Sequence, residues 1–160
     1  MGRMYTVGFK AVAATAQQDL IEILSATDAV TIIHDWTLSQ NTEIGDAQEE
    51  QLSIVENRGV GTVTSGSGGT SATPQPVQDG DTAFGGTVEV NNTTKMAVGT
   101  GTLEELPPYG WNVRTPFFKI YTPETRPVIS PGNRWTLELE TTPTDSITAN
   151  LNVTLEEIGG

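Results

Sequence analysis

Only one histidine, His34, is available for a Ser-His-Asp triad or a histidine-ligated metal centre. Its neighbour Asp35 cannot readily join it, because adjacent residues on an extended strand point to opposite faces. The chain also has no cysteine, which excludes thiol nucleophiles, disulfides and zinc-thiolate sites. We therefore interpret His34 as a hydrogen-bonded or surface residue, and we expect no catalytic residues, no metal site and no cofactor.

Two acidic segments could in principle supply oxygen ligands to calcium. They are residues 43–56, which include Asp46, Glu49 and Glu50, and the short sequence Asp79-Gly80-Asp81. Neither matches the spacing of a calcium-binding loop. We predict that the first segment is a solvated acidic edge, because charge runs of this length mostly serve solubility. A calcium site is the alternative.

Three tryptophans, Trp36, Trp111 and Trp135, could form a platform on which a sugar ring stacks, which would make the chain a carbohydrate-binding module. Trp36 and Trp135 lie within alternating apolar patterns, so we predict that they belong to the core or to a sheet face.

A proline-bounded segment contains the remaining tryptophan and supplies our candidate contacts to a partner. These candidates are Pro107, Pro108, Tyr109 and Trp111. Tyrosine and tryptophan combine a large apolar area with a polar group, so such a segment either anchors itself on the fold or contacts a second protein. Both interpretations stay open.

The composition favours a single domain made of strands and loops. The chain has 160 residues, of which 36% are hydrophobic and 18% charged, and it contains 17 glycines. Its net charge of −12 would repel nucleic acid. No apolar run is long enough to cross a membrane, and the N-terminus does not resemble a secretion signal, so we expect a soluble protein without a membrane partner.

Alternating apolar and polar residues predict antiparallel strands along most of the chain. The predicted strands are residues 4–12, 51–57, 87–94, 116–122, 134–141 and 146–157. Residues 19–38 are predicted to form a hairpin, with at most a short helical turn near residues 16–19. This number of strands predicts an all-β fold, an antiparallel β-sandwich of jelly-roll type over residues 1–160.

Two segments are predicted to lie outside the rigid sandwich. Residues 59–86 are rich in Gly, Ser, Thr and Pro and offer little apolar surface, so they predict one long exposed loop. Residues 1–15 could act as an N-terminal arm. Loops and termini can adapt to a partner while a sandwich stays rigid, so we expect these segments to be used in binding.

Several segments resemble small tailed-phage virion proteins of the capsid decoration, or cement, type. The resemblance lies in the general character of these segments and includes no catalytic motif. It rests on residues 46–52, 64–73, 88–94, 126–139, 143–146 and 151–157.

This resemblance implies a jelly-roll protein that is made in the host cytoplasm and lies on the outer surface of the phage capsid. There it would bind the major capsid protein and stabilise contacts between its copies. Capsid symmetry favours a homo-oligomer, a dimer or a trimer. The alternatives are a tail, baseplate or head-fibre protein, a carbohydrate-binding module, and a hydrolase whose site the sequence does not locate.

Overall fold

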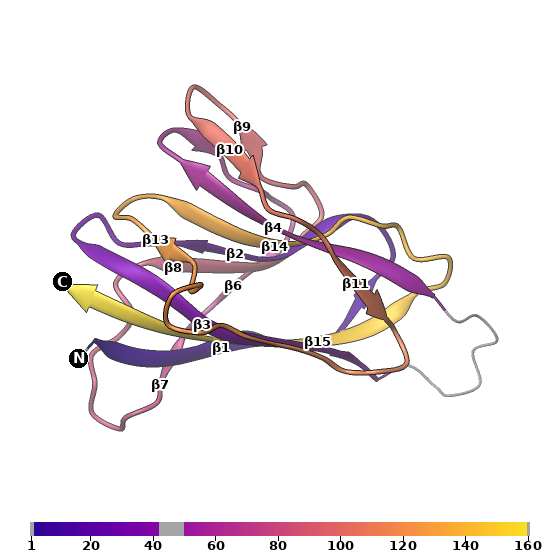
Figure 1. Ribbon diagram of the computed structural model, residues 1–160, viewed down its shortest axis with the longest axis horizontal. Helices are drawn as coiled ribbons and strands as arrows, with labels where there is room; N and C mark the ends of the chain where they lie inside the picture. The colour runs from indigo at the N-terminus through magenta and orange to yellow at the C-terminus, as the bar shows by residue number, and fades with distance from the viewer. Residues whose placement is uncertain (1, 42–49, 160) are drawn as a thin grey trace.

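The computed structural model describes residues 2–41 and 50–159, and these residues form strands and loops without any helix. Two antiparallel sheets pack face to face, with a small third sheet beside them (Figure 1). The predicted antiparallel β-sandwich is therefore confirmed. In the described ranges no helix exists that could span a membrane.

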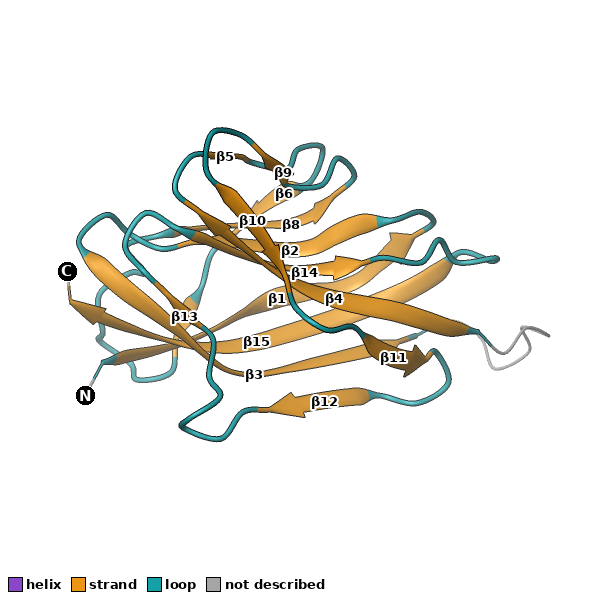
Figure 2. Ribbon diagram, turned by 45° about the horizontal axis from the view of Figure 1, so that its top comes forward, coloured by secondary structure: helices purple, strands orange, loops and turns teal. Residues whose placement is uncertain are grey.

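The first large sheet, sheet A, has six strands in the order β12-β3-β15-β1-β7, and β13 also pairs with β3. Its strands are β1 (Arg3–Ala14), β3 (Ala29–Gln40), β7 (Gln75–Pro76), β12 (Phe117–Ile120), β13 (Val128–Ile129) and β15 (Ile147–Gly159). The two ends of the described chain thus lie side by side in the sheet, since β1 pairs with β15 (Figure 2).

The second large sheet, sheet B, has seven strands in the order β10-β4-β14-β2-β8-β6, and β11 also pairs with β4. Its strands are β2 (Gln18–Leu24), β4 (Gln51–Val60), β6 (Thr70–Ala72), β8 (Thr87–Asn92), β10 (Thr102–Glu105), β11 (Tyr109–Asn112) and β14 (Arg134–Leu139). The small sheet joins β5 (Val63–Thr64) to β9 (Ala97–Val98).

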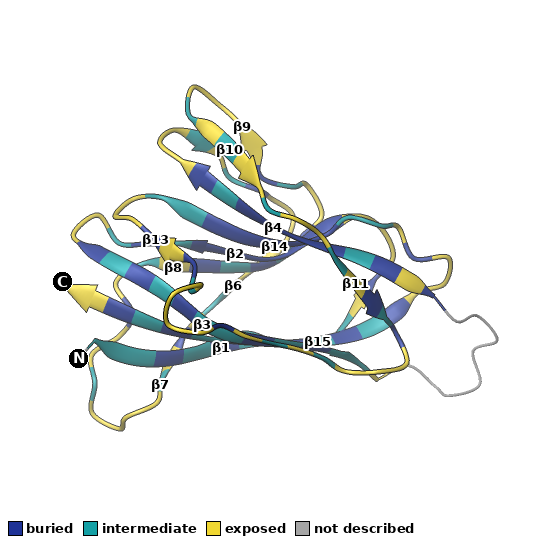
Figure 3. Cartoon of the chain, viewed as in Figure 1, coloured by how far each residue is buried: buried dark blue, intermediate teal, exposed yellow. Residues whose placement is uncertain are grey.

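The core lies between the two large sheets and is filled by the inward-facing side chains of both. Figure 3 shows buried residues alternating with more exposed ones as dark blue segments along β3 and β15, whereas β2 and β14 of sheet B are buried almost throughout. Trp36 and Trp135 are fully buried there, as their strand patterns predict. No disulfide helps to hold the sandwich together, because the chain has no cysteine.

The predicted hairpin over residues 19–38 is wrong. Strand β2 belongs to sheet B and β3 to sheet A, so the turn between them crosses from one sheet to the other. Residues 18–23 of β2 are all buried, because the core covers one face of sheet B and loop segments cover part of the other. A strand that is buried on both faces loses the alternation that would have revealed its place.

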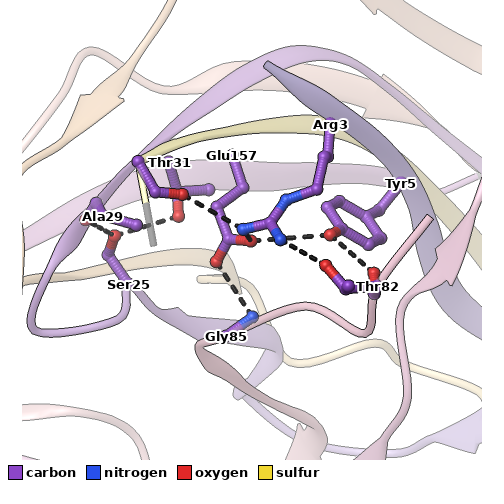
Figure 4. Close-up of polar contacts among 9 residues, drawn as sticks. Arg3, Tyr5, Ser25, Ala29, Thr31, Thr82, Gly85 and Glu157 are labelled. Atoms are coloured by element: carbon purple, nitrogen blue, oxygen red, sulfur yellow. Dashed lines mark hydrogen bonds and ion pairs between the residues drawn. The ribbon is translucent and has the colours of Figure 1, made fainter.

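The interpretation of residues 1–15 as an arm is also wrong, because β1 lies inside sheet A between β15 and β7. A polar cluster fixes its first residues (Figure 4). Arg3 pairs with the buried carboxylate of Glu157 at 2.8 Å, and the Tyr5 hydroxyl donates to the Thr82 carbonyl oxygen at 2.9 Å. The Glu157 carboxylate also accepts the Gly85 N–H at 2.9 Å.

Residues 59–86 are exposed over most of their length, but they are not one long loop. They include the end of β4 and the short strands β5, β6 and β7, which pair with β9, β8 and β1. Within the segment the Phe84 ring packs edge-on against Tyr5 at 5.5 Å. The low apolar content hid these anchors, because most of them are backbone hydrogen bonds to distant strands.

Candidate functional site

The outer face of sheet A carries most of the large apolar side chains that the fold leaves in solvent. Phe118 is 66% exposed, Ile120 78%, Val128 53% and Ile158 46%. Together with the half-buried Val30 and Ile32, these four residues define what we call the outer patch. Exposed apolar patches on soluble proteins commonly mark interaction sites, whereas singly scattered apolar residues need no explanation.

Strand β12 places two members of the outer patch through its alternation. It pairs with β3 at the edge of sheet A, with Phe118 opposite Thr37 and Ile120 opposite Asp35. Phe117 and Lys119 point the other way, because successive side chains of a strand alternate between faces. Phe117 stacks on Trp36 at 5.1 Å, and the Lys119 ammonium lies 4.7 Å from the centre of the Tyr109 ring.

The other members of the patch are cross-strand neighbours. Val128 of β13 lies opposite Ile32 of β3, and Ile158 of β15 lies opposite Val30 of β3. Directly opposed residues on one face of an antiparallel pair are in side-chain contact range. The patch therefore follows the edge of sheet A that β12 and β13 form beside β3, with Phe118 and Ile120 toward one end and Val30, Ile32, Val128 and Ile158 toward the other.

A titratable pair lies beside the aliphatic end. His34 Nε2 is 2.9 Å from a carboxylate oxygen of Glu156. Glu156 is the residue opposite Ile32 in the sheet. Burial opposes ionisation of Glu156, but the Gly2 N–H and His34 outweigh it and lower the pKa of the carboxyl. His34 is thus a hydrogen-bonded surface residue, as predicted.

The four candidate contact residues are not brought together on one surface. Pro107 and Pro108 are exposed, Tyr109 is half-buried, and Trp111 is buried with 1% of its surface accessible. The Trp111 indole N–H donates to the Thr115 carbonyl oxygen at 2.9 Å. Of the two interpretations of this tryptophan, the structure therefore supports the anchor.

The tryptophan platform is wrong, because Trp36, Trp111 and Trp135 are all buried and no face of an indole is free to stack on a sugar. Sequence reasoning missed Phe118, Ile120 and Val128 as surface residues. The segment Phe117-Phe118-Lys119-Ile120 carried a signal for this exposure. It places apolar residues on both faces of an edge strand, and only one of those faces can pack against the core.

The solvated acidic edge is wrong for the two glutamates of residues 43–56 that the structure describes. Glu50 accepts backbone N–H groups of Thr144 and Asp145 at 2.9–3.0 Å. Glu56 lies in the core with 1% exposure, where it accepts the Tyr121 hydroxyl and, at 3.2 Å, the Trp135 indole N–H. Asp46 and Glu49 lie outside the described residues.

Sheet B also buries charged groups on its outer face. Glu22 is 2% exposed and accepts the Ser65 hydroxyl and the Gly66 N–H, each at 2.8 Å, and it pairs with Arg134. These contacts attach the segment between β5 and β6 to the sheet. Such partners are far from Glu22 in the sequence, so no local pattern could reveal them.

Among residues 2–41 and 50–159, no group of three or more His, Cys, Asp or Glu side chains is arranged to hold a metal ion. No protein-family model matches the chain, and a search of curated proteins gave no match. The outer patch is therefore the site from which a function can be argued.

Proposed function

We propose that this chain is a structural protein of a phage virion, a capsid decoration protein that binds the outer surface of the head through the outer patch. The observation that supports this proposal most is the exposure of Phe118, Ile120 and Val128 along one sheet edge. The outer patch offers no catalytic group, and its chemistry suits association with another protein.

Burial of these side chains would supply the binding free energy. Moving a large apolar side chain such as Phe or Ile fully out of water contributes about 1.5–3 kcal/mol. A single patch of this size gives modest affinity, but a head presents many equivalent positions. A homo-oligomer that engages two or more capsid subunits would gain about 10²–10⁴-fold in avidity.

The net charge of −12 fits a position outside the capsid shell, away from packaged DNA. A clip across neighbouring capsid subunits adds interface area at the joints where internal pressure would separate them. Heads that lack the protein should therefore rupture at lower temperature than decorated heads.

The test is co-sedimentation of the purified chain with heads that lack it. Phe118→Ser and Ile120→Ser should each weaken binding about tenfold or more, which corresponds to 1.4 kcal/mol. Val77→Ser and Val98→Ser are matched controls, because both valines are 61% exposed and lie outside the outer patch.

Three results would contradict the proposal. The native chain could fail to co-sediment with heads, or electron microscopy of labelled particles could place it on the tail or baseplate. The second result would favour the alternative of a tail, baseplate or head-fibre protein. Unchanged binding by both patch variants would show that another surface makes the contact.

A further inference from the structure

Lys95 and Asn57 both donate hydrogen bonds to the carboxylate of Glu138, beneath the segment that follows β8. The Lys95 ammonium lies 2.5 Å from Oε1 of Glu138, and the Asn57 side-chain amide donates to Oε2 of the same carboxylate at 2.8 Å. The three residues come from separate places: Asn57 from β4, Glu138 from β14 and Lys95 from the segment between β8 and β9.

The strand register puts these groups on the outer face of sheet B. In β14 the core residues are Trp135, Leu137 and Leu139, so Glu138 faces outward. The covering segment is held over it at two points. The Met96 N–H donates to Asp19 of β2 at 2.6 Å, and the Met96 side chain lies close to Gly59 of β4.

The carboxamide and the carboxylate of the site are shielded from water. Asn57 is 4% exposed, Glu138 9% and Met96 6%, whereas the Lys95 side chain is 38% exposed. A neutral amine beside a carboxamide in such surroundings has few competing partners, and hydrolysis of the amide is suppressed.

A fourth residue, Thr136, belongs to this cluster. Thr136 lies opposite Asn57 in the β14–β4 pairing and therefore on the same face of the sheet. Its hydroxyl is fully buried and has no hydrogen-bond partner. Buried hydroxyls are almost always paired, so an unpaired one beside a carboxamide calls for an explanation. It can donate to a negative charge that develops on the Asn57 oxygen.

We infer that Lys95 and Asn57 form an intramolecular amide bond, with Glu138 as the general acid and base and Thr136 as a positioning hydrogen-bond donor. The inference does not depend on the proposed function. It assigns a covalent modification site to a cluster that the outer patch does not use.

The reaction balances without any added reagent. Glu138 takes a proton from the Lys95 ammonium, and the Nζ lone pair then attacks Cγ of Asn57 while the carbonyl electrons move to Oδ1. Glu138 returns its proton to Nδ2 and accepts a second one from Nζ. The Cγ–Nδ2 bond breaks, the carbonyl re-forms, and ammonia leaves and takes up the last proton as ammonium.

The reaction should be slow. The hydrogen bond that Lys95 donates to Glu138 raises the pKa of Lys95 against the opposing effect of burial, so the resting pair is ionic and the neutral amine is a minor species. Proximity compensates, because a held nucleophile needs to approach only to about 3–3.5 Å of the carbon. The lysine stem is flexible enough for that approach.

The decisive experiment is the intact mass of the native full-length chain, followed over days after purification. We expect a loss of about 17 Da, the mass of one ammonia. Tryptic digestion should then yield a branched peptide that joins Lys95 to Asn57, with no cleavage after Lys95. A native chain that keeps its full mass throughout would overturn the inference.

Matched variants separate the roles. Lys95→Arg keeps a positive charge beside Glu138, and Glu138→Gln keeps the shape of the glutamate side chain. Both variants should fold and retain their full mass. Both should melt several degrees below the linked native chain. Thr136→Val should link more slowly. Linkage in Glu138→Gln would overturn the role of the glutamate, and a loss of about 18 Da with a Lys95–Glu138 peptide would overturn that of Asn57.

Discussion

Glu56→Ala should be strongly destabilising, because Glu56 is the acceptor for two buried donors. Its carboxylate accepts hydrogen bonds from the Tyr121 hydroxyl and the Trp135 indole N–H. Tyr121 in turn accepts the Trp36 indole N–H at 3.0 Å. Burial and the negative charge of Glu56 hold the pKa of Tyr121 far above its usual range, so the phenol remains a donor.

The size of the loss follows from these contacts. Each donor left without an acceptor in the core costs about 1–3 kcal/mol, and the deleted carboxylate leaves a cavity between the sheets. We expect a total of about 3–5 kcal/mol, which is a large part of the stability of an ordinary domain. Glu56→Gln should lose less, because the amide oxygen can still accept one of the two bonds.

Urea unfolding followed by tryptophan fluorescence measures the effect, since all three tryptophans are buried in the native state. With a slope of about 2 kcal/mol/M, a loss of 4 kcal/mol moves the midpoint by about 2 M. Glu105→Ala, on the exposed part of β10, is the control and should change stability by about 0.5 kcal/mol or less.

A double-mutant cycle with Tyr121→Phe tests the reasoning itself. Removing both partners should cost less than the sum of the single changes, because the second change no longer orphans a buried group. A loss below about 1 kcal/mol for Glu56→Ala would refute the idea that this carboxylate organises the core.

Three further predictions concern single residues. Burial, despite the Met96 N–H, raises the pKa of Asp19 to about 7 from 3.8, so the native state holds a proton that the unfolded state releases, and stability should fall as pH rises from about 4 to 7. Asp19→Asn should remove that fall in urea titrations at several pH values, and an unchanged slope would contradict the assignment. Ala11 has a φ of 53° at the bulge of β1. Ala11→Val should therefore lower the free energy of unfolding by about 1–2 kcal/mol, whereas Ala11→Gly should not lower it. Equal melting temperatures for the two variants would argue against backbone strain at this position. Glu22→Ala should make the Gly66 amide proton exchange with solvent about tenfold faster or more, because a hydrogen bond to a charged group contributes about 1.5–3 kcal/mol. Native-like exchange would mean that other contacts hold the segment between β5 and β6.

The strands could be predicted from the sequence where one face is buried and the other is wet. Strand β15 shows this best, since its alternation runs from Ile147 to Glu157 without a break. Strand β2 could not be placed in its sheet, because it is buried on both faces and the turn after it fits either a hairpin or a crossing between sheets.

The buried charges were beyond the reach of the sequence. Glu56 looks like a surface residue within an acidic segment, and only the fold brings Tyr121 and Trp135 to it. The same holds for Lys95, Asn57 and Glu138, which are contributed by three distant segments. Exposure of the outer patch depends on which element covers sheet A, and local pattern carries no information about that.

The position of β15 has a consequence for how the chain folds during synthesis. This strand lies between β3 and β1, so it supplies hydrogen bonds to both of them although it is made long after them. Until residues 147–159 leave the ribosome, β1 and β3 each present an unpaired edge and cannot join. Sheet A can therefore be completed only once these residues are available, through contacts between segments far apart in the sequence, and folding of this kind is slow and exposes the nascent chain to aggregation.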